Sequence, residues 1–276
     1  MNLLEAIILG LLQGLTEFIP ISSTAHLTIA GQVLGLIDNN HPERWTSFIA
    51  IIQLGTLAAV LYYFRDDLLK LIKNFLKDNL DRKKFENQSL ESKLSWYIIF
   101  GTIPIVVIGL LFKDFIEGTF TKDLKVISLS LIILAIILFV AEKVAKLNKD
   151  IKQVDLKDSL LIGIAQAFAL IPGASRSGTT ITAGLFLGLN RESAARFSFL
   201  LSIPAILASG VLSAYQAIQY VSSTDILNII VATIVSAISG YFAIDFLINY
   251  LKKNNTYLFI FYRIVLGIII LLYISF

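Results

Sequence analysis

Long apolar segments alternate with short polar ones along most of this chain. A helix needs about 17–25 mainly apolar residues to cross the hydrocarbon core of a membrane. The alternation over about ten residues that a membrane β-barrel would show is missing from these segments. The pattern predicts six membrane-spanning helices, at about residues 46–64, 94–112, 125–141, 197–220, 226–250 and 256–276.

Two further apolar stretches, 3–37 and 159–189, are each interrupted by a polar break. Proline lacks a backbone N–H and disfavours helical geometry at the residue before it, so helices should end near Pro20 and Pro172. We therefore expect each stretch to form a re-entrant hairpin of two half-length helices. Such irregular backbone is tolerated at membrane depth only where it is buried in protein or lines a wet cavity.

One broken hairpin followed by three spans occurs twice, in residues 1–141 and 159–276. Both halves contain the pattern A-G-x-x-L-G-L, at 30–36 and 183–189, although two apolar, glycine-containing segments could match by chance. Three is an odd number of crossings, so the second hairpin should enter from the opposite side. The expectation is one membrane domain, 1–276, built as an inverted-topology repeat whose polar tips meet near mid-membrane.

Composition supports an all-α integral membrane protein. The chain is 56% hydrophobic and 16% charged, with a mean hydropathy of +0.78, whereas soluble domains carry about 25% charged residues. Most of the 23 Lys and Arg residues fall in the loops at 65–93, 142–158, 190–196 and 252–253. A cytoplasmic location of these loops would explain this distribution. This distribution gives no reason to expect a nucleic-acid partner, and the absence of cysteine excludes disulfides.

The first tip concentrates polar side chains in a short stretch: Gln13, Glu17, Ser22, Ser23, Thr24 and His26. Gln13 and Glu17 are four residues apart and share one helix face. A serine needs a nearby base to attack at neutral pH, and histidine suits that task, so Ser23 and His26 are a candidate couple. The alternatives are that the hydroxyls only cap the second half-helix and that His26 is a satisfied interior residue.

The second tip combines small residues, hydroxyls and one arginine, in the order Pro172-Gly173-Ala174-Ser175-Arg176-Ser177-Gly178. Glycines let successive backbone N–H groups face an anion, and a following helix presents its N-terminus to it. The fork of Arg176 matches phosphate oxygens. The alternative is a buried ion pair between Arg176 and Glu17, which could also open when an anion binds. Elsewhere, Asp245 and Arg263 lie at equal depth on consecutive spans and are expected to pair.

The motifs at both tips resemble those of the undecaprenyl-diphosphate phosphatase family linked to bacitracin resistance. Gln13-x-x-x-Glu17 is similar to the family's [E/Q]-x-x-x-E, and the stretch from Pro172 to Thr180 is similar to its P-G-x-S-R-S-x-x-T. The resemblance implies a bacterial inner-membrane enzyme that removes one phosphate from undecaprenyl diphosphate at an outward-facing site. It also implies recycling of the lipid carrier for peptidoglycan, with bacitracin competing for the lipid diphosphate.

The resemblance further implies roles for particular residues. Ser23 and His26 would be the reacting pair, Glu17 the metal-linked or histidine-orienting carboxylate, and Arg176 the diphosphate clamp. The other candidate substrate-binding residues are Gln13, Ser22, Thr24, Gly173, Ser175, Ser177, Gly178 and Thr180. A divalent cation, Mg²⁺ or Ca²⁺, is implied at Glu17 and Gln13, but an amide is a weaker ligand than the second glutamate of many members.

Three questions stay open at this point. The attacking group could be Ser23 with His26 as base, His26 itself, or water. Inverted repeats with broken helices also occur in transporters, so transport or flipping of a lipid phosphate is the rival function. The sequence does not fix the oligomeric state, and a homodimer is among the alternatives.

Overall fold

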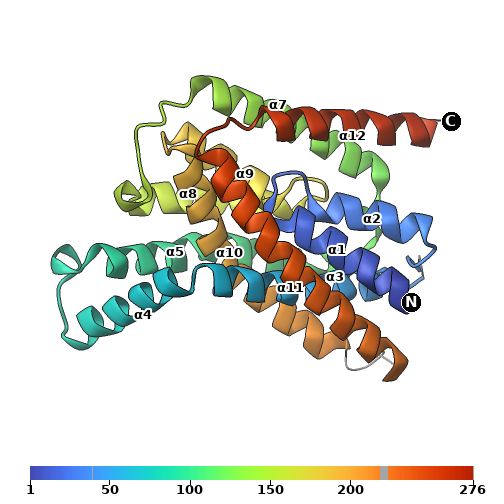
Figure 1. The fold of residues 1–276 in the computed structure, drawn as a ribbon, viewed down its shortest axis with the longest axis horizontal. Helices are drawn as coiled ribbons and strands as arrows, with labels where there is room; N and C mark the ends of the chain where they lie inside the picture. The colour runs from blue at the N-terminus through green and yellow to red at the C-terminus, as the bar shows by residue number, and fades with distance from the viewer. Residues whose placement is uncertain (39, 218–222, 276) are drawn as a thin grey trace.

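The computed structural model describes residues 1–38, 40–217 and 223–275, most of which are helical (Figure 1). The helices are α1 (Leu3–Phe18), α2 (Ser23–Val33), α3 (Pro42–Tyr63), α4 (Arg65–Leu80), α5 (Leu90–Leu111), α6 (Lys113–Glu117), α7 (Leu124–Val144), α8 (Leu156–Ala167), α9 (Arg176–Phe186), α10 (Arg191–Ala217), α11 (Ser223–Leu251) and α12 (Tyr257–Ser275). Short 3-10 turns are η1 (Phe85–Asn87), η2 (Thr119–Lys122), η3 (Ile151–Gln153) and η4 (Phe168–Leu170). Within the described ranges there is no strand, only an isolated bridge between Lys149 and Leu189.

In the described part of the chain, six helices are long and apolar enough to cross a membrane: α3, α5, α7, α10, α11 and α12. The all-α, multi-pass membrane fold expected from the sequence is therefore confirmed. The expected span at 197–220 is longer at its start, because α10 begins at Arg191, and its expected last residues lie outside the described part of the chain. The stretch 65–93, expected as a loop, contains α4 and the start of α5, which pack against each other.

Both apolar stretches with a central proline are broken where expected. α1 ends at Phe18 and α2 begins at Ser23, with Pro20 between them. α8 ends at Ala167, η4 adds one turn, and α9 begins only after Pro172. The breaks have the physical cause that the sequence suggested, since neither proline can donate within a helix. Entry of the hairpins from opposite sides of a membrane stays a prediction.

The two hairpins share unusual backbone geometry. Ser22 and Ser175 cap α2 and α9, with φ of 75° and 68°. Gly35 and Gly188 follow the two helices with φ of 67° and 88°. α1 packs on α11 and α8 on α5, so each first half-helix has a long helix as its neighbour. These matched positions are what the expected duplication requires, and the duplication itself stays a prediction.

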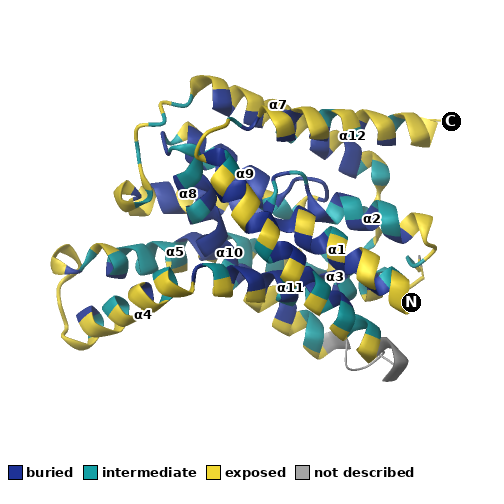
Figure 2. Cartoon of the chain, viewed as in Figure 1, coloured by how far each residue is buried: buried dark blue, intermediate teal, exposed yellow. Residues whose placement is uncertain are grey.

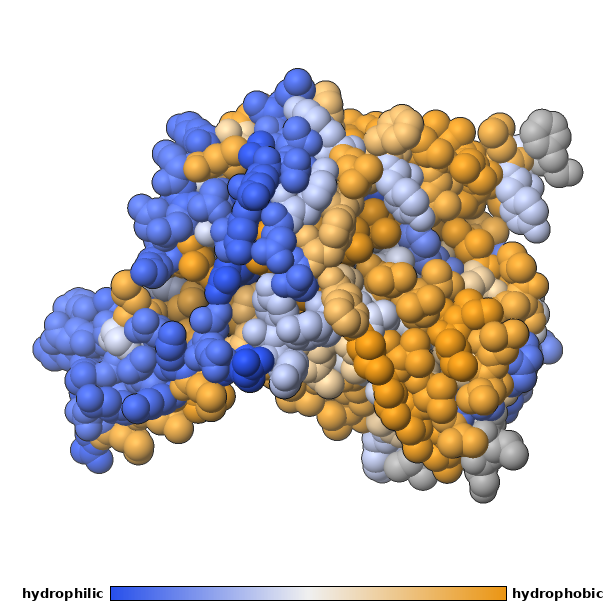
Figure 3. Space-filling model, in the orientation of Figure 1, coloured by the Kyte–Doolittle hydropathy of each residue, from blue (hydrophilic) through white to orange (hydrophobic). Residues whose placement is uncertain are grey.

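Burial divides the molecule into a packed centre and an apolar outer surface. Dark blue buried residues gather where α8, α9 and α10 meet, and exposed residues run along the outer faces of α11 and α12 (Figure 2). On the face seen in Figure 3, hydrophilic residues lie over the α4–α5 turn and apolar residues cover the opposite part. This separation is typical of a protein that has one lysine-rich end in water and its flanks in lipid.

Charged networks close the polar end of the molecule. Glu142 accepts from Arg191 Nε at 2.7 Å and from Thr256 Oγ1 at 2.8 Å, so one buried carboxylate links α7 to the starts of α10 and α12. In the α4–α5 turn, hydrogen bonds from Lys83 and from the backbone and hydroxyl of Ser89 hold the pKa of Asp78 well below its usual range. Asp78 therefore stays ionised near neutral pH and keeps the turn closed.

The hairpin that carries Glu17 is held by a very close helix crossing. A Cβ added at Gly10 would lie 2.4 Å from the backbone oxygen of Ala232, and one added at Gly14 would lie 1.9 Å from Ser239 Oγ. Both partners are on α11. Small residues at this spacing let two membrane helices approach closely, so these glycines set the position of the tip of α1.

We expect Gly14→Ala to destabilise the protein by about 1–3 kcal/mol, the usual cost of overpacking a close contact. Gly109→Ala is the matched control, because nothing lies within 4 Å of its added Cβ. The thermal unfolding midpoints of both purified variants in detergent provide the measurement. Equal midpoints for the two variants would contradict the proposed role of the α1–α11 crossing.

Candidate active site

A cavity of about 330 Å³ lies where the two hairpin tips meet. Six of the residues expected from the sequence line it: Glu17, Ser22, Ser23, Thr24, Ser175 and Arg176. The remaining wall is largely apolar and includes Ile105, Val106 and Leu110 of α5 with Ala205, Ala208 and Leu212 of α10. The cavity therefore has a polar end at the tips and an apolar wall contributed by two spanning helices.

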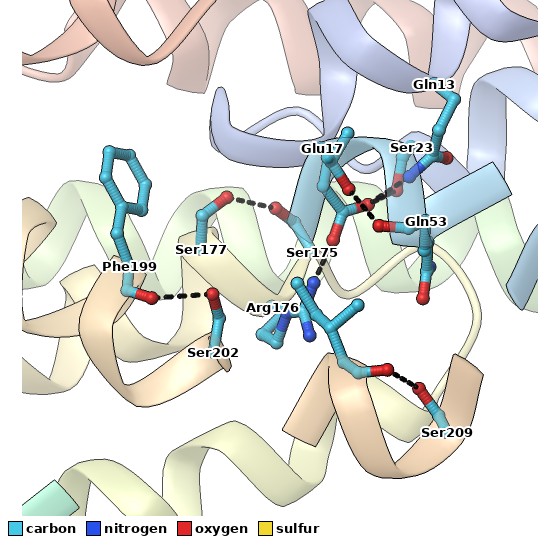
Figure 4. A network of polar contacts seen from close by, with 12 residues as sticks. Gln13, Glu17, Ser23, Gln53, Ser175, Arg176, Ser177, Phe199, Ser202 and Ser209 are labelled. Atoms are coloured by element: carbon cyan, nitrogen blue, oxygen red, sulfur yellow. Dashed lines mark hydrogen bonds and ion pairs between the residues drawn. The ribbon is translucent and has the colours of Figure 1, made fainter. Parts of the chain in front are cut away.

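Glu17 is the centre of the polar cluster (Figure 4). Its Oε2 accepts a hydrogen bond from Gln13 Nε2 at 2.9 Å and another from Ser23 Oγ at 2.7 Å. Its Oε1 forms an ion pair with Arg176. The buried carboxylate of Glu17 thus connects α1, the start of α2 and the start of α9.

The ion pair between Glu17 and Arg176 was one of the two alternatives for Arg176, and the structure contains it. The two side chains are 3% and 15% exposed. Removing one partner of such a buried pair leaves an uncompensated charge, which costs several kcal/mol. A second bond joins the tips, since Ser177 Oγ donates to the carbonyl of Ile19 at 3.3 Å. The structure therefore brings the two tips together, as the sequence predicts.

His26 is placed differently from the expected couple with Ser23. Its Nδ1 lies 2.7 Å from the carbonyl of Ser22 and its Nε2 lies 2.6 Å from the hydroxyl of Tyr262. The imidazole also stacks on the ring of Tyr262, with centroids 5.6 Å apart. Both ring nitrogens are thus engaged away from Ser23, whose hydroxyl faces Glu17. Nothing in the sequence could have revealed Tyr262, which lies 236 positions away.

The hydroxyls at the second tip divide into two groups. Ser175 lines the cavity and caps α9, because its Oγ accepts from the N–H of Gly178 at 3.1 Å. Thr180 is fully buried, and its Oγ1 bonds the carbonyl of Arg176 and lies 2.6 Å from Ser198 Oγ. The expected residues that lie outside the cavity lining are Gln13, His26, Gly173, Ser177, Gly178 and Thr180. Two of them hold lining residues directly, since Gln13 donates to Glu17 and Gly178 donates to Ser175.

The expected pair between Asp245 and Arg263 is wrong. Asp245 accepts from Tyr63 at 3.3 Å and from Asn249 at 3.0 Å. Arg263 instead donates to the carbonyls of the second tip. Equal depth on neighbouring helices did not fix which way each side chain points, and Arg263 instead satisfies carbonyls of an irregular loop, which have no partner in a helix.

Cations other than Arg176 also reach the cavity wall. Lys122 is buried, and its Nζ donates to Thr46 Oγ1 at 2.6 Å and to the carbonyl of Gly118 at 2.8 Å. Lys122 and Lys113 both line the cavity, which sequence reasoning missed because it counted them only as loop charges. The cavity lining thus carries positive charge in two places.

The donor atoms near Glu17 are of the type that bind hard cations. Gln13 Oε1 is buried and has no hydrogen-bond partner among the described residues. Together with the Glu17 carboxylate it offers oxygen ligands, which Mg²⁺ and Ca²⁺ prefer. The described part of the chain contains no group of three or more His, Asp and Glu residues that could enclose a metal. Glu17 and Gln13 therefore fit a cation that takes most of its ligands from water and from the substrate.

The fold and the site together define a multi-pass α-helical membrane protein with an anion-suited cavity at the junction of two broken helices. Residues 6–269 match the model of the family described as bacitracin resistance protein BacA. The chain is 55% identical over 268 residues to a protein named undecaprenyl-diphosphatase from Syntrophobacter fumaroxidans, covering 97% of this chain and 95% of that one. Proteins of the same name from Chloroherpeton thalassium and Myxococcus xanthus are 50% and 48% identical, over 100% and 98% of this chain and 98% and 89% of theirs. The chain belongs to the bacitracin resistance protein BacA family, which confirms the resemblance seen in its motifs.

Positive φ at the two capping serines leads to a prediction about stability. Ser175→Ala loses the cap of α9 and keeps a backbone conformation that disfavours Cβ, so we expect a loss of about 1 kcal/mol. Ser175→Gly also loses the cap but relieves the strain, so its cost should be only a few tenths of a kcal/mol. Thermal unfolding in detergent measures both, and the same order should hold for Ser22→Ala and Ser22→Gly. Alanine variants as stable as the glycine ones would refute the argument.

Proposed function

We propose that this protein hydrolyses undecaprenyl diphosphate to undecaprenyl phosphate and inorganic phosphate. It thereby recycles the lipid carrier of bacterial cell-wall synthesis. The relatives named undecaprenyl-diphosphatase support this proposal, since they match almost the whole chain. The observation that carries it is the meeting of Ser23, Glu17 and Arg176 in one cavity.

The walls of the cavity support a lipid substrate. A water-soluble phosphate ester would not need a site bordered by spanning helices. The apolar residues of α5 and α10 line the same cavity as the polar tips. A long-chain diphosphate can place its phosphates at the tips while its prenyl chain lies along the apolar wall, where contact with water is avoided.

In our mechanism Ser23 Oγ attacks the terminal phosphorus of the diphosphate. Its proton passes to Glu17 Oε2, which already accepts the hydrogen bond from this hydroxyl at 2.7 Å. The bond from phosphorus to the bridging oxygen breaks, and undecaprenyl phosphate leaves. Water then attacks the phosphorus of the phosphoserine, the bond from phosphorus to Ser23 Oγ breaks, and Glu17 returns its proton to that oxygen. The protons of the water leave with inorganic phosphate. Phosphoryl transfer depends mainly on positioning and charge neutralisation, which this cluster supplies.

Arg176 links substrate binding to activation of Glu17. In the free protein its guanidinium holds the carboxylate as an ion pair. A guanidinium matches phosphate oxygens as well as carboxylate oxygens. When a diphosphate takes Arg176 as its partner, Glu17 is released from the ion pair and is free to take the proton of Ser23. The two alternatives for Arg176, ion pair and phosphate clamp, are then successive states of one site.

His26 acts in this scheme by holding Ser22, which precedes the nucleophile. The rival assignment makes His26 itself the nucleophile, after a rotation that frees it from Tyr262. Quenching the enzyme during turnover separates the two, because phosphoserine survives acid and phosphohistidine does not. A protein that accumulates neither adduct would point to direct attack by water.

A divalent cation, Mg²⁺ or Ca²⁺, belongs to the proposal. Glu17 and Gln13 Oε1 would hold it, with substrate oxygens and water completing its shell. When bound, it would neutralise charge on the phosphates. Gln13 also orients Glu17 directly, through the hydrogen bond from its Nε2 at 2.9 Å.

The placement in the cell is likewise proposed. We infer a bacterial inner membrane with the cavity opening outward, because the lysine-rich segments at 65–93 and 142–158 then lie in the cytoplasm. Resistance to bacitracin would follow from competition for the lipid diphosphate. A homodimer is compatible with the exposed apolar faces of the spanning helices.

Removing the reacting groups should abolish turnover. We expect Ser23→Ala and Glu17→Gln to lower kcat by about 10³-fold or more, the range found when a nucleophile or its base is removed. Arg176→Lys should lower kcat/KM by about 10²-fold, because the bidentate fork is lost. Phosphate release from undecaprenyl diphosphate in detergent is the measurement. Glu5→Gln, a half-buried glutamate at the other end of the same helix, is the control, and Ser23→Ala with undiminished turnover would overturn the mechanism.

The metal proposal has its own test. Chelation by EDTA should stop turnover, and added Mg²⁺ should restore it. Gln13→Glu places a second carboxylate beside Glu17 and should lower the half-saturating Mg²⁺ concentration about tenfold, because a charged ligand holds the cation more tightly. The exposed Gln153→Glu is the control. Full activity after chelation would rule the cation out.

A further inference from the structure

Arg263 is a buried cation that has no carboxylate partner among the residues that the structure describes. It lies in α12 and is fully buried, with 0% of its surface exposed. Its Nη2 donates to the carbonyls of Gly173 at 3.3 Å and Ala174 at 2.9 Å. Its Nε and Nη1 have no hydrogen-bond partner in the described part of the chain. A buried charge in this state is costly, so a compensating group is expected nearby.

The loop from Pro172 to Arg176 separates Arg263 from the cavity. Pro172, Ser175 and Arg176 line the cavity, whereas Arg263 does not. Beyond the loop, Nη1 lies against the first turn of α9, since a Cβ added at Gly178 would be 2.6 Å from it. The guanidinium is therefore packed against the back of the segment that we assign to phosphate binding.

The hydrogen bonds of Arg263 orient the peptide groups of this loop. In a trans peptide the C=O and the N–H of the next residue point in opposite directions. The carbonyl of Ala174 points to Arg263, so the N–H of Ser175 points away from it and toward the cavity side of the loop. The first N–H groups of a helix also lack partners within the helix, which adds those of Arg176 and Ser177. Together they form a donor set for an anion.

We propose that Arg263 is a positioning residue for phosphate binding. It turns the carbonyls of Gly173 and Ala174 away from the cavity and places a fixed positive charge behind the N–H groups that face the anion. A bound phosphate then supplies the negative charge that the described residues do not provide. This inference rests on the phosphate site of the proposed function and adds a second arginine to it, one that never touches the substrate.

The test uses inorganic pyrophosphate with excess Mg²⁺ and the full-length protein in detergent. The thermal unfolding midpoint is followed against pyrophosphate concentration, which gives an apparent dissociation constant without turnover. We expect Arg263→Gln to weaken pyrophosphate binding by about tenfold or more, because the fixed positive charge behind the N–H groups is lost. Arg263→Lys, which keeps the charge but only part of the fork, should bind with intermediate affinity.

A structural control separates positioning from simple destabilisation. In Gly55→Ala the added Cβ would lie 2.1 Å from the backbone oxygen of Thr233, so the variant disturbs the packing of α3 on α11, away from the loop. It should unfold at a lower temperature and yet bind pyrophosphate like the unmodified protein. Unchanged affinity in Arg263→Gln, or a loss of equal size in Gly55→Ala, would overturn the inference.

The remaining outcomes are also decisive. If Arg263→Gln fails to fold, the lysine variant decides, and wild-type affinity in it contradicts the proposal. If the thermal unfolding midpoint of the unmodified protein does not change with pyrophosphate concentration, both the phosphate site and the role of Arg263 are overturned. Pyrophosphate binding that depends on Arg263, in a protein that releases no phosphate from undecaprenyl diphosphate, would refute the enzymatic function and leave this inference standing.

Discussion

Polar groups placed among spanning helices must find partners, and the ion pair between Glu17 and Arg176 is the contact through which this chain meets that requirement. It joins two helix ends that are far apart in sequence. The breaks at Pro20 and Pro172 expose backbone and side-chain donors that could not be left unpaired in an apolar surrounding. The site is therefore a consequence of the interruptions, because the same groups that satisfy the broken ends are those suited to bind a phosphate.

The sequence predicted the features that local chemistry decides. Two prolines marked the helix breaks, six apolar runs marked the spans, and the tips were expected to meet, as they do. α4 was missed because its many polar residues are typical of a loop. Its helix is stabilised by packing on α5, which the sequence does not show. Ser23 and His26 were paired because they are close in sequence, yet the hydroxyl prefers a carboxylate and the imidazole finds Tyr262. Contacts between segments far apart in the sequence decided both features, and such contacts cannot be recognised from a single sequence.

Arg263 illustrates the same limit more sharply. Its place in an apolar span made it conspicuous, and depth alone suggested Asp245 as its partner. The depth of a residue does not specify the direction in which its side chain points around the helix. The carbonyls of an irregular loop need hydrogen-bond donors, so the position of the loop does specify that direction. The structure thus places an arginine on each side of the second tip: the partly exposed Arg176 on the cavity side and the buried Arg263 behind it. Local charge at the tip exceeds what its single carboxylate neutralises, which is the electrostatic condition for holding a diphosphate.

Broken helices in paired hairpins also occur in transporters, where the site must open alternately to each side. In this chain the bonds that close the site also join its two halves, namely Glu17 to Arg176 and Ser177 to Ile19. Alternating access would require these buried bonds to break in each cycle, which costs several kcal/mol unless an anion replaces the carboxylate. When an anion replaces the carboxylate at Arg176 alone, the bond from Ser177 to the Ile19 carbonyl stays in place, and Glu17 is freed beside the Ser23 hydroxyl. The arrangement therefore favours chemistry at a fixed junction over movement of the substrate through it.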